Sequence, residues 1–256
     1  MPDSDSSAGG DRRESPIEVT PDALERQRRS ELSLRNRLAG LPHDPVPTDL
    51  PPIVGESQVV LESPGDVARR MLALFAIAVR GESLAGPQPI DLTRINDRMP
   101  LAVESLTAGE VELLQRDGLP LDAVDAMAWR YETVLALQWA LVMQPELPWP
   151  DERCDLATVS RLMLDLPHVD VIEHARLRPV DQLLDEADFH LRALWSIAAA
   201  QMRGEPIENT LDPGIVSERW LALSWCCRLH DSQQATAGER FAMTEAWIDS
   251  GMQSSG

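Results

Sequence analysis

The stretch AMAWRYETVLALQWALVM, residues 126–143, constrains the fold more than any other part of the chain. Wound as a helix, it is apolar almost all the way round, and such a helix must be covered on every side by other elements. It also carries Arg130 and Glu132 in its first turns. A buried charge is costly unless an opposite charge satisfies it. The stretch therefore predicts a central helix, covered by further helices that bring charged residues of their own.

Apolar spacing and capping signals predict helices over most of the remaining chain. Thr107 and Glu110 fit a capping box, and Gly81 and Gly204 are predicted helix ends. The predicted helical segments are residues 20–40, 63–81, 106–118, 121–143, 155–166, 179–204 and 212–230, followed by a final turn within 242–251. The fold class that follows is all-α, a single multi-helix bundle of about seven or eight helices with at most a minor β element.

Two segments leave their secondary structure open. SQVVLES, residues 57–63, has a β-branched pair and fits one short strand, although no partner strand is evident. Residues 167–178 fit either a turn followed by a helix or an irregular bridge. The region 41–55 holds five prolines and is predicted to be an extended crossing loop.

The domain organisation follows from length and composition. A chain of 256 residues with 43 % apolar side chains can bury a sizeable core. Residues 1–22 have few side chains to bury, which predicts a disordered acidic and polar tail before a helical domain over residues 23–250. The sequence shows neither a long uncharged apolar run nor a secretory signal, so we expect a cytoplasmic protein that does not bind membranes.

The charge is strongly negative, with 42 acidic against 23 basic residues and a formal net charge of -19. This balance disfavours binding to nucleic acid or to an anionic bilayer, and it favours either a basic protein partner or simple solubility. Every basic residue other than histidine is arginine. The absence of lysine excludes a Walker lysine and a lysine Schiff base.

Three predicted helices carry opposite charges within a turn of a tryptophan. Such residues either form a buried ion network that fixes helix packing, or they line a cleft that holds a ligand. Asp188 and Arg192 are four residues apart and therefore face each other on one helix. Both hypotheses expect the charges from all three helices to converge. The six candidate binding residues are Arg130, Glu132, Asp188, Arg192, Glu218 and Arg219.

Motifs typical of cofactor, metal and nucleophile sites are missing from the sequence. No GxGxxG, P-loop, GxSxG or HExxH pattern occurs, and His168 and His174 are six apart, which does not place two ligands on one helix face. The three cysteines lack partners at ligand spacing and are expected to be reduced and mostly buried. The sequence thus predicts no cofactor and no metal.

Tryptophan is the most abundant aromatic residue, with seven copies against three Phe and one Tyr. At helical spacing, tryptophans are more often core fillers than parts of a ligand cage. Trp149, between prolines in LPWPDE, is the exception and is expected to be exposed or at a rim. It is therefore the candidate anchor for a partner.

The order of these segments resembles a bacterial family, the domain of unknown function 4272. The likeness covers most of residues 23–247. It is carried by the Arg/Ser-rich first helix, by AWRYETVLALQWALVM, by LLDEADFHLRALWSIAAAQ and by GIVSERWLALSWCCRL. The resemblance implies a helical bacterial cytosolic domain and places the six charged residues at family-like positions. It implies no activity.

Two hypotheses about function remain open. The first is a non-catalytic binding protein, similar to an immunity or adaptor protein, whose acidic surface covers a basic protein partner. The alternative is a small-molecule enzyme or ligand sensor that uses the carboxylate and arginine cluster in an inter-helix pocket. The sequence does not choose between a pocket and a structural network, and it leaves the oligomeric state open.

Overall fold

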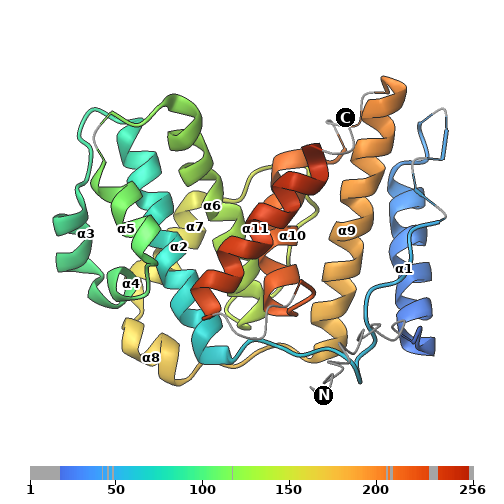
Figure 1. The fold of residues 1–256 in the computed structure, drawn as a ribbon, viewed down its shortest axis with the longest axis horizontal. Helices are drawn as coiled ribbons and strands as arrows, with labels where there is room; N and C mark the ends of the chain where they lie inside the picture. Colours follow the sequence, from blue (N-terminus) through green and yellow to red (C-terminus); the bar gives the residue numbers. More distant parts are fainter. Residues whose placement is uncertain are drawn as a thin grey trace, which may run out of the picture.

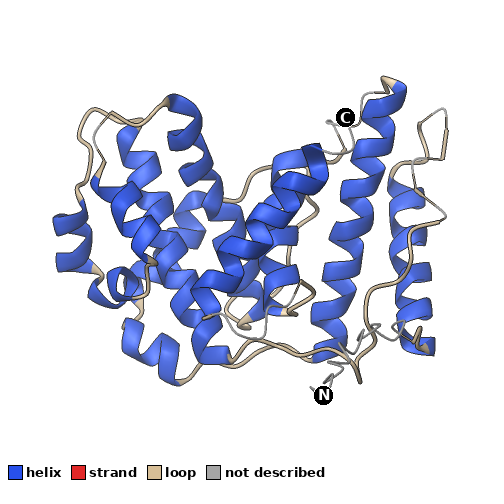
Figure 2. Cartoon of the chain, viewed as in Figure 1, coloured by secondary structure: helices blue, strands red, loops and turns tan. Residues whose placement is uncertain are grey.

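The chain folds into a helical bundle, seen here in a computed structural model that describes residues 18–41, 43–44, 46–47, 49–116, 118–205, 207, 210–230 and 236–253, with side chains as far as residue 246. The described residues form eleven helices and no strand (Figure 2), which confirms the all-α class. The helices are α1 Pro21–Arg37, α2 Pro64–Leu84, α3 Leu92–Arg98, α4 Pro100–Glu104, α5 Ala108–Gln115, α6 Leu121–Ala140, α7 Leu156–Asp165, α8 His168–Glu173, α9 Val180–Arg203, α10 Pro213–Cys226 and α11 Ala237–Gln253. The part of the tail before residue 18 lies outside the described residues.

Helix α6 is the central helix that its sequence predicts. Helix α2 packs along it, α10 packs on both α6 and α9, and α1 lies beside α9 at the far side of the bundle (Figure 1). From residue 131 to residue 141 every side chain of this stretch is buried. The main core is built from the apolar faces of α2, α6 and α10, and a smaller core lies between α1 and the second half of α9.

Several helix ends follow the predicted signals. Thr107 and Glu110 form a complete capping box at α5, and Gly204 adopts a left-handed conformation with φ of 69° after α9. Gly81 does not end α2, which continues to Leu84. A Cβ at Gly81 would lie 2.5 Å from Cβ of Met127, so this glycine instead lets α2 approach α6 closely.

The structure contains more helices than the sequence indicated. The short helices α3, α4 and α8 follow closely on prolines, and each has seven residues or fewer. Such lengths give little periodicity to detect. The final turn predicted within 242–251 is part of α11, a helix of 17 residues.

The segment 57–63 is not a strand. It forms a turn and then an unpaired extended stretch, because no other segment of the described chain lies beside it as a strand. Besides hydrogen bonds within its turn and to Glu18, the segment bonds to helices α10 and α11. The Glu62 amide donates to the carbonyl of Cys226 over 2.9 Å, and the Glu62 carboxylate pairs with Arg240 of α11.

Candidate functional site: a charged network beneath the α6–α7 loop

Helices α6 and α10 bring four of the six candidate residues together. Arg130 and Glu132 lie on α6, and Glu218 and Arg219 lie on α10. Because Glu218 and Arg219 are adjacent, their side chains diverge around the helix and each has a different partner. The result is two separate ion pairs, an inner pair of Glu132 with Arg219 and an outer pair of Arg130 with Glu218.

The inner pair is buried. Arg219 donates from Nε and Nη2 to one carboxylate oxygen of Glu132 over 3.1 and 2.9 Å, and the two side chains are 0 % and 2 % exposed. The other oxygen of Glu132 accepts from the Cys154 amide over 2.6 Å, and Nη1 of Arg219 donates to the carbonyl of Pro148. The inner pair therefore binds two points of the backbone between α6 and α7.

The outer pair lies closer to the surface. Nη1 of Arg130 donates to both carboxylate oxygens of Glu218 over 3.0 Å, and Thr133 donates its hydroxyl to the same carboxylate. The second guanidinium nitrogen of Arg130 pairs with Glu245 of α11. Arg130 thus connects α6 with both α10 and α11.

The segment between α6 and α7, residues 141–155, is here called the α6–α7 loop. Besides the inner pair, Arg178 and the backbone of Asp212 hold the backbone of this loop. Arg178 donates from Nη2 to the carbonyls of Gln144 and Pro145, and from Nε to the carbonyl of Trp139, near the end of α6, over 2.7 Å. The Asp212 amide donates to the carbonyl of Pro150 over 2.7 Å.

Trp149 is half-buried within this loop. Its indole N–H donates to the carbonyl of Thr210 over 2.6 Å, and its ring lies 5.3 Å from the ring of Phe189. The guanidinium of Arg37 lies over the same ring, 4.7 Å from its centre. Trp149, expected to be exposed or at a rim, is thus half-buried and also holds the loop against α1 and α9.

Asp188 and Arg192 form a pair within α9 that is separate from the other four residues. As their spacing predicts, they face each other, with distances of 2.9 and 3.1 Å, and both side chains are 0 % exposed. The remaining donors of Arg192 reach the carbonyls of Leu50 and Pro51 and the carboxylate of Glu31. Within the described residues, no hydrogen bond joins this pair to α6 or α10, so convergence of all three helices on one network is not observed.

Sequence reasoning missed two residues of α9 that lie near Arg219. Burial raises the pKa of the Glu186 carboxyl to about 7, although the charge of Arg219 opposes the shift. Burial and the charge of Arg219 lower the pKa of His190 to about 3, and Nδ1–H of this ring donates to the Glu186 carbonyl over 2.8 Å. The only sequence signal was the four-residue spacing of Glu186 and His190 on one helix face.

The site offers little that is reactive. Burial, reinforced by the negative charge of Glu132, raises the pKa of the Cys154 thiol well above its usual value, so this cysteine stays protonated. All three cysteines are free thiols, as expected. In the described part of the chain, no three His, Cys, Asp or Glu side chains are grouped so that they could hold a metal ion.

Comparison with known proteins gives one match. The model of a protein family described as Domain of unknown function (DUF4272) matches residues 26–236. No curated protein and no solved structure matches the chain. Of the helices in the described residues, none combines the length and the apolar character needed to cross a membrane.

Proposed function

Because the chain belongs to the family described as Domain of unknown function (DUF4272), whose description names no activity, we propose a function from the geometry of the loop. The protein is a non-catalytic binding protein that recognises a basic protein partner through the carboxylates of the α6–α7 loop. One observation carries this proposal: the backbone of an irregular loop is held at several points by buried or half-buried side chains of other elements.

The loop exposes acidic side chains, and its one arginine, which is also exposed, lies against an aromatic ring. Glu146, Asp151 and Glu152 are exposed. Arg153 lies over the ring of Trp129, 3.6 Å from its centre, so its charge is directed at an aromatic face and not at these carboxylates. The loop therefore presents negative charge in a fixed arrangement.

A fixed loop supports a binding role for a physical reason. Ordering a flexible loop on association costs free energy, and a loop that is already held avoids that cost. The net charge of -19 adds long-range attraction for a basic partner and raises the rate of encounter. Together, these features fit a protein that covers a basic surface, as an immunity or adaptor protein does.

The alternative hypothesis, an enzyme or ligand sensor built on the six charged residues, has less support. General acid or general base catalysis requires a carboxylate that can reach a substrate. Each of the three carboxylates is instead paired with an arginine, Glu132 with Arg219, Glu218 with Arg130, and Asp188 with Arg192. These pairs serve first to fix helices and loops, so the alternative stays a prediction without a reactive group.

The test is a titration with decaarginine as the basic probe. The loop variant combines Glu146→Gln, Asp151→Asn and Glu152→Gln. A matched control removes the same number of charges from exposed positions at the other end of the bundle, by Asp97→Asn, Glu104→Gln and Glu112→Gln (Figure 1). Each exposed ion pair contributes about 0.2 to 1 kcal/mol, so the loop variant should bind the probe roughly tenfold more weakly.

The control variant should bind within about twofold of the unmodified chain at the same ionic strength. Equal weakening by both variants would show that only net charge matters and would overturn the proposal of a specific loop. An unchanged affinity for the loop variant would overturn it as well. Circular dichroism and the unfolding midpoint, measured on both variants, confirm that each is folded.

A further inference from the structure

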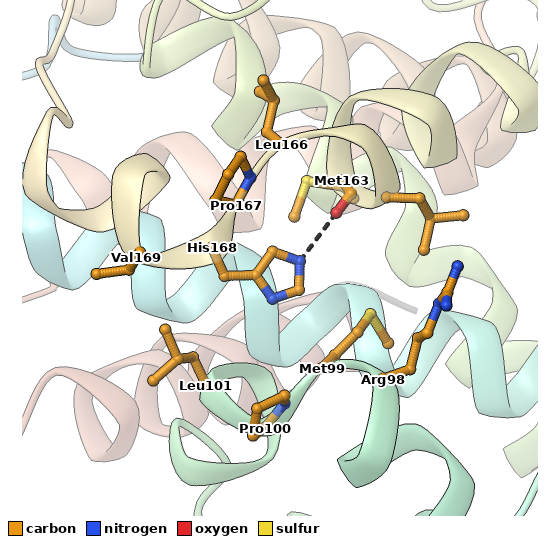
Figure 3. A pocket seen from close by; sticks show the side chains of 10 residues that line it. Arg98, Met99, Pro100, Leu101, Met163, Leu166, Pro167, His168 and Val169 are labelled. Atoms are coloured by element: carbon orange, nitrogen blue, oxygen red, sulfur yellow. Dashed lines mark hydrogen bonds between the residues drawn. The ribbon is translucent and has the colours of Figure 1, made fainter.

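A pocket of about 280 Å³ lies at the junction of four short or terminal segments, away from the α6–α7 loop. It is lined by residues 98–101, where α3 ends and α4 begins, and by residues of the stretch 163–169, where α7 ends and α8 begins (Figure 3). Eight of the ten residues that line it have apolar side chains, among them the buried Met99 and Met163 and the exposed Leu166. Such a lining is typical of small-molecule sites.

Arg98 is the single formal charge among the ten residues that line this pocket. No carboxylate lines it, although the chain holds 42 acidic residues and the exposed Asp97 and Asp165 are neighbours in sequence. Arg98 is exposed, as Arg94 is, and in the part of the chain that the structure describes its guanidinium makes no hydrogen bond or ion pair. Figure 3 places its side chain at one side of the pocket, so a cation without an acceptor stands beside apolar walls.

His168 adds one oriented polar group. Its Nε2–H donates to the carbonyl of Met163 over 2.9 Å, and because a carbonyl only accepts, this contact fixes the ring. In the neutral ring, Nδ1 is then the acceptor. The ring lies between Pro167 and Met99 in Figure 3. The pocket thus offers an apolar wall, one cation and one acceptor.

We propose that this pocket binds a small apolar monocarboxylate, with the carboxylate on Arg98 and the hydrocarbon chain against Met99, Met163 and Leu101. The guanidinium fork matches a carboxylate in two parallel hydrogen bonds, which a cationic or neutral ligand does not use. Ligand pockets usually hold about 300 to 1,000 Å³, so the volume of this one limits its occupant to a small molecule. The site shares no residue with the α6–α7 loop and does not depend on the function proposed for it.

The experiment uses hexanoate as the probe and the methionine methyl groups as the readout. The chain has nine methionines, and labelling them with ¹³C gives one methyl signal for each. Saturable shifts are expected for Met99 and Met163, assigned by single Met→Leu variants. Hexylamine, which has a chain of the same length and the opposite charge, should leave both signals in place.

Two variants and one control sharpen the test. Arg98→Gln should weaken hexanoate binding about tenfold or more, because it removes a charge-assisted pair of hydrogen bonds. Arg94→Gln is the matched control, since Arg94 is exposed one turn earlier on α3 and does not line the pocket. Leu166→Trp, at an exposed position, fills the pocket and should abolish the shifts while the unfolding midpoint is retained.

The proposal is overturned by any of three results. Hexanoate at saturating concentration leaves the Met99 and Met163 signals unmoved; hexylamine binds as tightly as hexanoate; or Arg98→Gln binds hexanoate as tightly as Arg94→Gln does. Shifts that occur only in methionines outside the pocket count against it in the same way.

Discussion

Two buried ion pairs of this protein have nearly the same chemistry and different positions in the chain. The inner pair, Glu132 with Arg219, joins α6 to α10 across 87 residues of sequence. The pair of Asp188 with Arg192 lies within a single helix, at a spacing of four. In both pairs the guanidinium is 0 % exposed and binds a carboxylate through two of its nitrogens. The difference in position decides what each pair stabilises.

The remaining donors of the two arginines explain why both charges are tolerated inside the bundle. Arg219 donates to the carbonyl of Pro148, and Arg192 donates to the carbonyls of Leu50 and Pro51. Pro148 and Pro51 belong to proline-rich segments that cannot satisfy their own carbonyls by forming a helix. Each buried arginine therefore holds a nearby irregular segment in place. The inner pair joins α6 to α10 directly, whereas the α9 pair holds its helix to one linker and, through Glu31, to α1.

Of the two buried pairs, the inner pair should contribute more to the free energy of unfolding. Glu132→Gln leaves the buried guanidinium of Arg219 without a counter-charge and weakens the hold on the Cys154 amide. We expect the free energy of unfolding to fall by on the order of 3 to 5 kcal/mol, measured by urea denaturation. The double variant Glu132→Met with Arg219→Met should be more stable than the sum of the two single changes implies.

The same variants test whether the inner pair is structural. A functional pair would lose binding on Glu132→Gln with an unfolding midpoint close to that of the unmodified protein. A midpoint that stays constant in Glu132→Gln, and strict additivity in the double variant, would contradict the structural role.

A smaller effect is expected for the α9 pair. In Asp188→Asn, Arg192 still donates hydrogen bonds to the carbonyls of Leu50 and Pro51 and to the carboxylate of Glu31. Its buried positive charge therefore retains hydrogen-bond acceptors and one counter-charge. The expected loss is about 2 kcal/mol, the scale of a hydrogen bond to a charged group, measured by the same denaturation. Hydrogen exchange should increase in residues 50–54 and not in the α6–α7 loop.

The matched control on the same helix is Asp181→Asn. Asp181 is exposed in the first turn of α9, so its removal should cost less than about 1 kcal/mol. If Asp188→Asn destabilises as much as Glu132→Gln, the extra acceptors of Arg192 do not compensate and the contrast between the two pairs fails.

The contrast also shows what the sequence can predict. Asp188 and Arg192 were predicted to face each other because the period of a helix alone fixes that contact. The capping box at Thr107 and the buried character of α6 are local in the same sense. Contacts of this kind require no knowledge of how the helices are arranged.

The contacts that could not be predicted from the sequence depend on how the helices are arranged in space. The sequence nominated Glu132 and Arg219 but gave no sign that they are partners, because 87 residues separate them. Several arginine donors end on backbone carbonyls, as those of Arg178 do, and a carbonyl has no sequence signature. Gly81 was predicted to end a helix for a related reason, since its role is a close approach to Met127 on another helix.

A pH-dependent effect is expected for Glu186 and His190, the α9 residues that feel the charge of Arg219. The pKa of Glu186 rises from 4.5 to about 7 on folding, so its contribution to stability is full below pH 4.5 and is lost as the pH rises to 7. The pKa of His190 falls from 6.5 to about 3, so its contribution is full above pH 6.5 and is lost as the pH falls toward 3. Between pH 4.5 and 6.5 the two slopes oppose each other.

Glu186→Gln removes one of these opposing slopes. The free energy of unfolding of this variant should therefore rise more steeply from pH 4.5 to pH 6.5 than that of the unmodified protein, as measured by urea denaturation at several pH values. Glu173→Gln, at an exposed position of α8, is the control and should leave the slope unchanged. Parallel pH profiles for Glu186→Gln and the unmodified protein would show that Glu186 ionises as an exposed glutamate does. Glu186 would then be electrostatically independent of the inner pair.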